Sequence, residues 1–163
     1  MFSRAEPYIG NQFAPREVQV ILDSYYHYLK KPLIAQHPFP NDEKKLSEEL
    51  YQATFALVAH DTSSDPIFFY ANCLAQQLFE MNWSEITSIP SRQSAEPILQ
   101  SERQALLDRV AQYGYINDYS GIRISKSGRR FWIRNATVWN LIDEQGKIGR
   151  AHVWTPVTFR NLV

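Results

Sequence analysis

The sequence predicts an α+β fold: a five-stranded antiparallel sheet with a helical insertion and two N-terminal helices. Apolar residues recur at helical spacing in the first third, whereas long β-branched and aromatic segments dominate the last third. Between them, a short apolar strand leads directly into a helix at Asn72. We expect one globular unit, with residues 1–53 as an arm and two helices packing on the sheet and residues 54–163 as the core.

Two helices are expected before the first strand. Pro15 can open the first of them, because the N–H that proline lacks would have no partner in a first helical turn, and the pattern continues to Lys30. Asn41 or Asp42 is expected to cap the second helix. Residues 1–14 show no period and are expected to form a loose arm.

The central stretch predicts two strands and a helix. Thr54–His60 and Ile67–Tyr70 are expected to pair across a polar turn, and the apolar run of the second is typical of a strand covered on both faces. Asn72 then stands where a helix N-cap belongs. Apolar residues at helical spacing give this helix one buried face: Leu74, Leu78 and Met81.

The helical insertion continues from there. Ser84 is expected to cap a short turn, and Ile89–Pro97 is expected to be irregular backbone. Ser101 and Gln104 have capping-box spacing and are expected to open a longer helix. Gly114 is suited to end that helix, because glycine adopts the left-handed conformation without strain.

The last third predicts an antiparallel meander of long strands. They are Tyr115–Ser125, Arg130–Asp143 and Ile148–Phe159, joined by hairpins at Ser127-Gly128 and Gln145-Gly146. Pro156 cannot donate a ladder hydrogen bond, so we expect a bulge or an early end there.

This order of elements is that of a PAS domain, and several stretches resemble one family. They are Asp65–Asn72, Leu78–Met81, Pro90–Pro97, Asp118–Ser125 and Ser127–Phe131, which are similar to the MEKHLA family. That family comprises small PAS-like bacterial proteins and the C-terminal domain of plant class three homeodomain–leucine-zipper regulators. The resemblance extends from about Val18 to Phe159. It implies a PAS-like sensory or interaction module and supplies no catalytic residue; Glu80 departs from the PAS pattern, in which a glycine is common after the core helix.

Composition further narrows the range of possible functions. Basic and acidic residues number 17 each, so no net positive field favours nucleic acid. The sequence has no apolar stretch long enough for a membrane span and no recognisable secretory signal, which predicts a cytoplasmic protein without a membrane partner. Cys73 is the only cysteine, so an intramolecular disulfide and a cysteine-based zinc site are excluded.

Metal patterns are incomplete, and no metal site is predicted. Asp61, Ser63 and Asp65 alternate like calcium-loop ligands, but Pro66 and Asn72 replace the glycine and glutamate that such a loop requires. A hydrogen-bonded turn is the favoured interpretation.

Haem and covalent flavin are disfavoured, and the identity of any cofactor stays open. The usual haem-ligand region of a PAS domain holds no histidine, and Cys73 lies on the core helix rather than in the later insertion that carries the reactive cysteine of flavin-binding PAS domains. His60 beside Asp61 could be a base or a ligand, yet a histidine at a strand end is more often an ordinary hydrogen-bonding residue.

Candidate ligand-binding residues come from the strands and the insertion. Arg92 could grip a carboxylate or phosphate with two hydrogen bonds, although a pair with Glu96 is the favoured explanation. Tyr119 and Arg123 share one strand face, and the remaining aromatic residues could line a cavity or simply pack in the core. The predicted set is Tyr70, Ser91, Arg92, Tyr119, Arg123 and Trp139.

We therefore expect a sensory or ligand-binding module without its own output domain, which binds a small molecule and signals through a partner protein. The alternative is a pure interaction module with a filled core, forming a homodimer through its N-terminal helices, where Tyr26 and Tyr28 widen the apolar surface. No nucleophile–base pair or phosphate loop is recognisable, so no enzymatic activity is expected.

Overall fold

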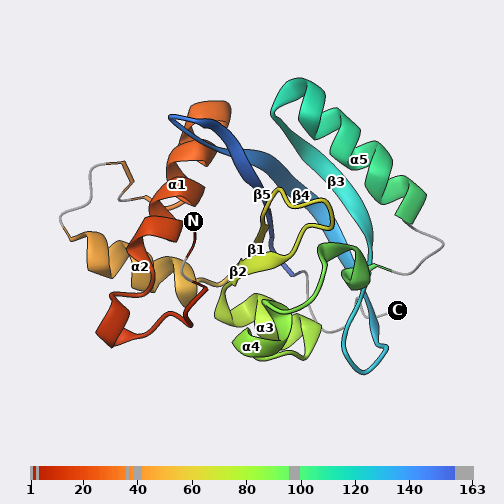
Figure 1. Ribbon diagram of the computed structural model, residues 1–163, viewed down its shortest axis with the longest axis horizontal. Helices are drawn as coiled ribbons and strands as arrows, with labels where there is room; N and C mark the ends of the chain where they lie inside the picture. Colours follow the sequence, from red (N-terminus) through yellow and green to blue (C-terminus); the bar gives the residue numbers. More distant parts are fainter. Residues whose placement is uncertain (1, 3, 36, 39–41, 96–99, 157–163) are drawn as a thin grey trace.

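The structure, a computed structural model, describes residues 2, 4–35, 37–38, 42–95 and 100–156. Within these residues, five antiparallel strands form one sheet, as the sequence predicts. Their order in the sheet is β2-β1-β5-β4-β3. The strands are β1 (Ala56–His60), β2 (Phe68–Ala71), β3 (Tyr115–Ile124), β4 (Arg130–Asp143) and β5 (Gly146–Trp154). Figure 1 shows α1 and α2 on one side of the sheet and α5 running beside β3.

One face of the sheet packs against α1 (Pro15–Leu29) and α2 (Glu43–Tyr51). Trp139 of β4 is the centre of this layer: it is fully buried, its indole N–H donates to the Ile21 carbonyl at 3.2 Å, and the Tyr25 ring meets it edge-on. Asp42 caps α2 by accepting two backbone N–H bonds, which confirms one of the two predicted caps; Asn41 lies outside the described residues.

The segment before α1 is not a loose arm, so that prediction is wrong for its described residues. Phe2 stacks on Phe69 with ring centroids 3.8 Å apart, and Phe13 is buried. The indole N–H of Trp83 donates to the Arg4 carbonyl at 2.9 Å. Aromatic side chains on this segment bury apolar surface that helical periodicity alone does not reveal.

The opposite face packs against the helical insertion: α3 (Cys73–Phe79), α4 (Trp83–Ile86), η2 (Ser91–Ser94) and α5 (Gln100–Tyr113). Asn72 caps α3 as predicted. Two other predicted caps are wrong. Ser84 lies inside α4, whose cap is Asn82 in a reciprocal pair with Glu85, and Ser101 lies inside α5. Asparagine and serine cap equally well, so composition could not choose between neighbouring candidates.

The ends of the strands follow local backbone chemistry. β5 begins at Gly146, two residues earlier than predicted, and ends at Trp154, an early end before Pro156. The part of the predicted strand beyond Pro156 lies outside the described residues. Gly114 has the left-handed conformation predicted for the residue after α5.

Glu80 takes the left-handed position at the end of α3, with φ of 56°. Its carboxylate accepts the Ser125 hydroxyl at 2.7 Å and the Ser127 backbone N–H at 3.2 Å. These bonds hold the pKa of Glu80 down at about 2. A glycine at this position would relieve the backbone but could not tie the β3–β4 hairpin to α3.

Candidate ligand-binding pocket

A small pocket lies between the sheet and the insertion. Its volume is about 20 Å³, which is room for one or two water molecules. Its apolar wall consists of Val58, Phe68, Phe79, Ile133 and Trp154, and its polar groups belong to His60, Ser91, Ser94, Arg103, Arg123 and His152. A site with an apolar wall and a few convergent polar groups is the usual form of a small-molecule pocket.

Strand alternation places the two pocket histidines. His60 follows Val58 by two residues on β1, so both side chains face the same way. His152 of the neighbouring β5 stands opposite Val58 in the ladder. The rings of His60 and His152 consequently lie with their centroids 5.8 Å apart.

The hydrogen bonds of His60 define its tautomer. Its Nδ1 lies 3.0 Å from the Asp61 backbone carbonyl, which can only accept, so Nδ1 bears the proton. Nε2 of the neutral ring is therefore an acceptor. Among the described residues, this Nε2, Nδ1 of His152 and Nε1 of Trp154 are all buried without a hydrogen-bond partner.

Burial keeps both histidines neutral. It lowers the pKa of His60 to about 4 and that of His152 well below its usual range, because the charged rings would lose their hydration. The adjacent His60 ring and nearby arginines lower the pKa of His152 further.

Arg123 and Arg103 give the pocket positive charge. Arg123 is 5% exposed; its guanidinium lies over the Tyr119 ring, 5.1 Å from the centroid, and donates to the Ile122 carbonyl. Arg103 of α5 donates to the Ser91 hydroxyl. Burial and the charge of Arg123 lower the pKa of Arg103 to about 10, so it stays charged at neutral pH. In the part of the chain that the structure describes, neither arginine has an ion-pair partner.

The structure divides the predicted ligand-binding residues into three groups. Ser91 and Arg123 line the pocket, and Tyr119 lies beside it under Arg123. Arg92 turns away and binds Asp65, its Nε lying 3.0 Å and 3.2 Å from the two carboxylate oxygens. Its alternative partner, Glu96, lies outside the described residues.

Tyr70 and Trp139 belong to the other side of the sheet. Tyr70 is fully buried with its ring edge-on to Trp83, and both Tyr70 and Trp139 pack in the layer beneath α1 and α2. These two side chains are therefore separated from the pocket by the sheet itself.

The predicted set left out His60, His152, Arg103, Ser94 and Trp154, although Trp154 was one of the aromatic residues that could line a cavity. A signal for two of them was present: His152 and Trp154 alternate on the last strand just as Val58 and His60 alternate on the first. Knowing that β1 and β5 are neighbours would have brought these pairs together.

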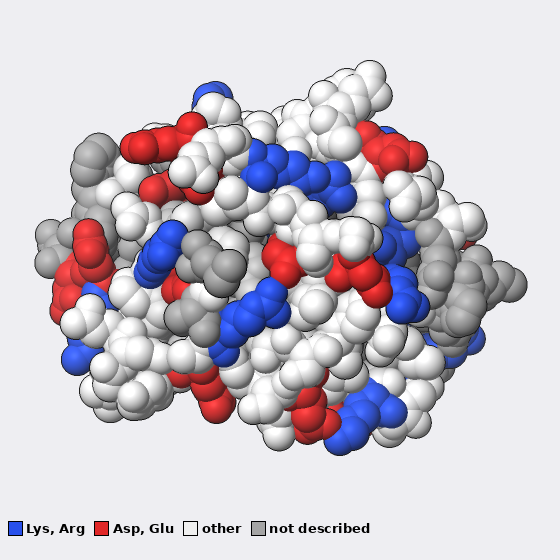
Figure 2. Space-filling view, in the orientation of Figure 1, with Lys and Arg blue, Asp and Glu red and all other residues white. Residues whose placement is uncertain are grey.

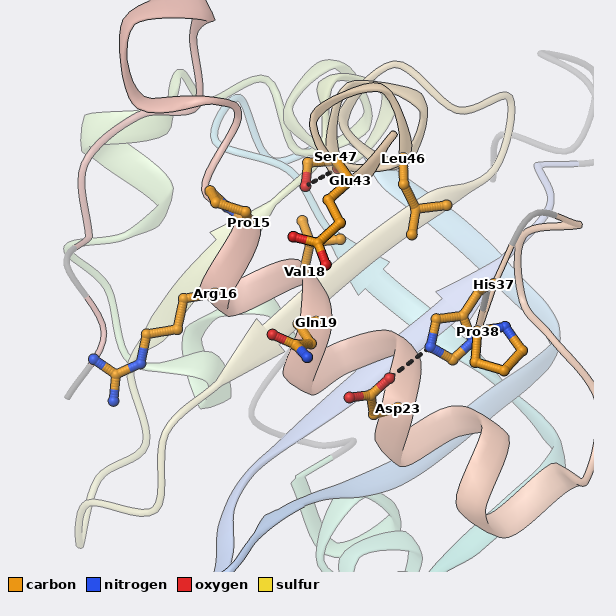
Figure 3. Close-up of a pocket in the computed structure, with 10 residues that line it drawn as sticks. All are labelled: Pro15, Arg16, Val18, Gln19, Asp23, His37, Pro38, Glu43, Leu46 and Ser47. Carbon is orange, nitrogen blue, oxygen red and sulfur yellow. Dashed lines mark hydrogen bonds and ion pairs between the residues drawn. The ribbon is translucent and has the colours of Figure 1, made fainter. Parts of the chain in front are cut away.

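A second pocket, of about 300 Å³, lies between α1 and α2 (Figure 3). His37 Nε2 there lies 2.6 Å from a carboxylate oxygen of half-exposed Asp23, so its charge is already balanced when it is protonated. On the face seen in Figure 2, acidic and basic residues are interspersed rather than gathered by sign. The inner pocket instead combines several unpaired polar atoms with unbalanced charge, which makes it the stronger candidate.

Several other features of the described residues bear on possible function. The described residues contain no cluster of three or more histidine, cysteine, aspartate or glutamate side chains that could hold a metal ion. Asp61 accepts hydrogen bonds from Ser63 and from the Ile67 backbone, which is the hydrogen-bonded turn that the sequence favoured. Cys73 is half-buried, and burial raises the pKa of its thiol. Among the described helices, none has the length and hydrophobicity of a membrane span.

The strand order, the helical insertion and the pocket between them are those of a PAS-like protein. Solved structures of PAS and light-oxygen-voltage domains have a similar fold. The PAS domain of a Colwellia psychrerythraea protein is similar with a TM-score of 0.60 and 16% identity, over 71% of this chain and 96% of that one. A light-oxygen-voltage domain studied with a flavin analogue has a TM-score of 0.55 and 20% identity, over 71% of this chain and 87% of that one. A PAS domain from a two-component sensor histidine kinase has a TM-score of 0.55 and 17% identity, over 68% of this chain and 94% of that one. At these identities the likeness shows the fold.

The family follows from the sequence. The MEKHLA domain profile matches residues 16–159, and the chain belongs to the MEKHLA domain family. No curated protein matches the sequence.

Proposed function

We propose that this chain is a sensory module that binds a small, partly apolar molecule in the inner pocket and signals through a partner protein. The observation that supports it is the convergence on one pocket of three buried atoms that find no hydrogen-bond partner among the described residues: His60 Nε2, His152 Nδ1 and Trp154 Nε1. Each such atom costs about 1–3 kcal/mol when it stays unpaired, so a ligand that pairs it is favoured. In this proposal the module works in the cytoplasm and catalyses no reaction.

The sheet offers a route from pocket to surface. On β1, Val58 and His60 face the pocket, whereas Leu57 and Ala59 face the layer under α1 and α2. A ligand that moves β1 therefore also moves the surface on which the N-terminal helices rest. Packed layers transmit such shifts because close-packed interiors compress little.

Thermal unfolding with a panel of short-chain carboxylates, polyols and amines tests the proposal. We expect at least one class to raise the melting temperature saturably. Ser94→Val should weaken that effect by filling the pocket, since Ser94 is buried there, while exposed Ser88→Val should not. A panel without any saturable effect would contradict a ligand-binding role.

The exposed apolar residues support homodimerisation as a second proposal. Tyr26 on α1 is 39% exposed, and Tyr8 and Ile9 before α1 are more so. Sedimentation velocity over about a hundredfold range of concentration, equivalent to about 2.8 kcal/mol of association free energy, should show a dimer that Tyr26→Ser weakens. A native protein that sediments as a monomer throughout would remove this proposal.

A further inference from the structure

We infer that the ligand of the inner pocket is a small hydroxycarboxylate, held at its carboxylate by Arg103 and Arg123 and at its hydroxyl by Nε2 of His60. This inference rests on the proposed function and names the chemical class of the ligand. It follows from three properties of the pocket: its charge, its hydrogen-bonding groups and its size.

The first property is unbalanced positive charge. Arg103 and Arg123 both line the pocket, and the described residues pair neither of them with a carboxylate. Burial, and after it the charge of Arg123, lower the pKa of Arg103. A buried charge without a counter-ion is costly, so an anion between the guanidinium groups would relieve both desolvation and repulsion. Guanidinium groups match carboxylates especially well, because two parallel N–H bonds fit the two carboxylate oxygens.

The second property is an acceptor, Nε2 of His60, in a pocket that also holds donors. The Asp61 carbonyl fixes the proton of His60 on Nδ1, which leaves Nε2 able only to accept. Trp154 Nε1 is a donor without a partner among the described residues. An anion with acceptors alone would satisfy the arginines and Trp154 but not His60. A ligand that also bears a hydroxyl satisfies all of them.

The third property is size. The pocket has a volume of about 20 Å³ and an apolar wall that includes Val58, Phe68 and Phe79. An apolar wall disfavours a fully hydrated ion such as phosphate, and the volume disfavours an aromatic ring. Glycolate, with a short carbon skeleton, is among the smallest hydroxycarboxylates, yet it exceeds the room for one or two water molecules. In this proposal the half-buried Arg103 side chain therefore moves outward to admit it.

Calorimetric titration compares glycolate with acetate, which lacks the hydroxyl, and with glycolamide, which lacks the charge. We expect glycolate to bind about tenfold more tightly than acetate, the value of one hydrogen bond, and glycolamide to bind more weakly than either. Nitrate and phosphate are expected to bind more weakly than glycolate. Equal binding of nitrate or phosphate would overturn the assignment of a carboxylate.

Substitution of the two arginines tests whether glycolate binds in this pocket. Arg103→Gln and Arg123→Gln should each weaken glycolate binding at least tenfold, the value of a lost charged hydrogen bond. Arg109→Gln should not, because Arg109 is on the same helix but pairs with exposed Asp118. The indole N–H resonance of Trp154 should shift on titration with glycolate, while that of Trp139 on the other face stays in place. This resonance also reports whether each variant is folded.

The outcomes separate the two proposals. Glycerol or ethanolamine binding in place of glycolate, with a shift of the Trp154 resonance, would overturn the hydroxycarboxylate and leave a ligand-binding pocket. The absence of binding by all carboxylates, polyols and amines would overturn both. Glycolate binding that Arg103→Gln and Arg123→Gln leave unchanged in folded protein would overturn the assignment of these arginines.

Discussion

Replacing Asn72 by alanine is expected to lower the free energy of unfolding by about 3–5 kcal/mol, the range of a broken buried hydrogen-bond network. Asn72 is fully buried. Its side-chain oxygen accepts the backbone N–H groups of Leu57 at 3.0 Å and Ala75 at 3.2 Å. Its side-chain amide donates to the carbonyls of Leu50 at 3.2 Å and Phe55 at 2.8 Å. One side chain thus joins α2, β1 and α3, and alanine would remove this partner from the Leu57 and Ala75 N–H groups and from the Phe55 carbonyl.

Asn82→Ala is the matched control. Asn82 caps α4 through the Glu85 N–H in an exposed setting, so its loss should cost only about 1 kcal/mol. Urea unfolding of both variants, followed by tryptophan fluorescence, measures the difference. An Asn72→Ala variant no less stable than Asn82→Ala would show that the network contributes nothing beyond an ordinary helix cap.

Asn72 also shows which features of the fold can be predicted from the sequence. An asparagine between an apolar strand and an apolar helix identifies a cap, because capping is local chemistry. The bonds to Leu50 and Phe55 depend on how α2 packs, which no local pattern contains. The same distinction explains why the strands and most helices were predictable from period and turns, whereas the packing of Phe2 and Phe13 was not.

The pocket was predictable only in part, for a related reason. Period-two alternation tells which residues share a face of a strand, but not which face meets the insertion when both faces are apolar. The prediction therefore included Arg123, which lines the pocket, but it also included Trp139, which belongs to the layer beneath α1. His60 and His152 are far apart in sequence and meet only through the pairing of β1 with β5.

Acidification from about pH 7 to about pH 5, the range in which histidines titrate, is expected to destabilise the ligand-free protein. In the unfolded chain His60 binds a proton near the ordinary histidine pKa of 6.5, whereas in the folded protein it does so only at about 4. Between these values the unfolded chain holds more protons, so a falling pH favours unfolding. For His60 alone the loss by about pH 5 is about 2 kcal/mol. The pKa of His152 is lowered in the same direction and adds to the loss.

A His60→Gln variant separates this effect from the titration of carboxylates. Glutamine does not titrate, so the unfolding free energy of this variant should fall less between about pH 7 and about pH 5 than that of the native protein. His27→Gln is the matched control for the substitution itself, because His27 is exposed on α1 and lies outside the pocket. Parallel profiles for the native protein and His60→Gln would mean that His60 has the same pKa in the folded and unfolded states, so that the folded protein also takes up its proton between about pH 7 and about pH 5. Such a proton would sit beside Arg103 and Arg123 only if an anion were already bound between them, so the pH profile also reports whether the purified pocket is empty.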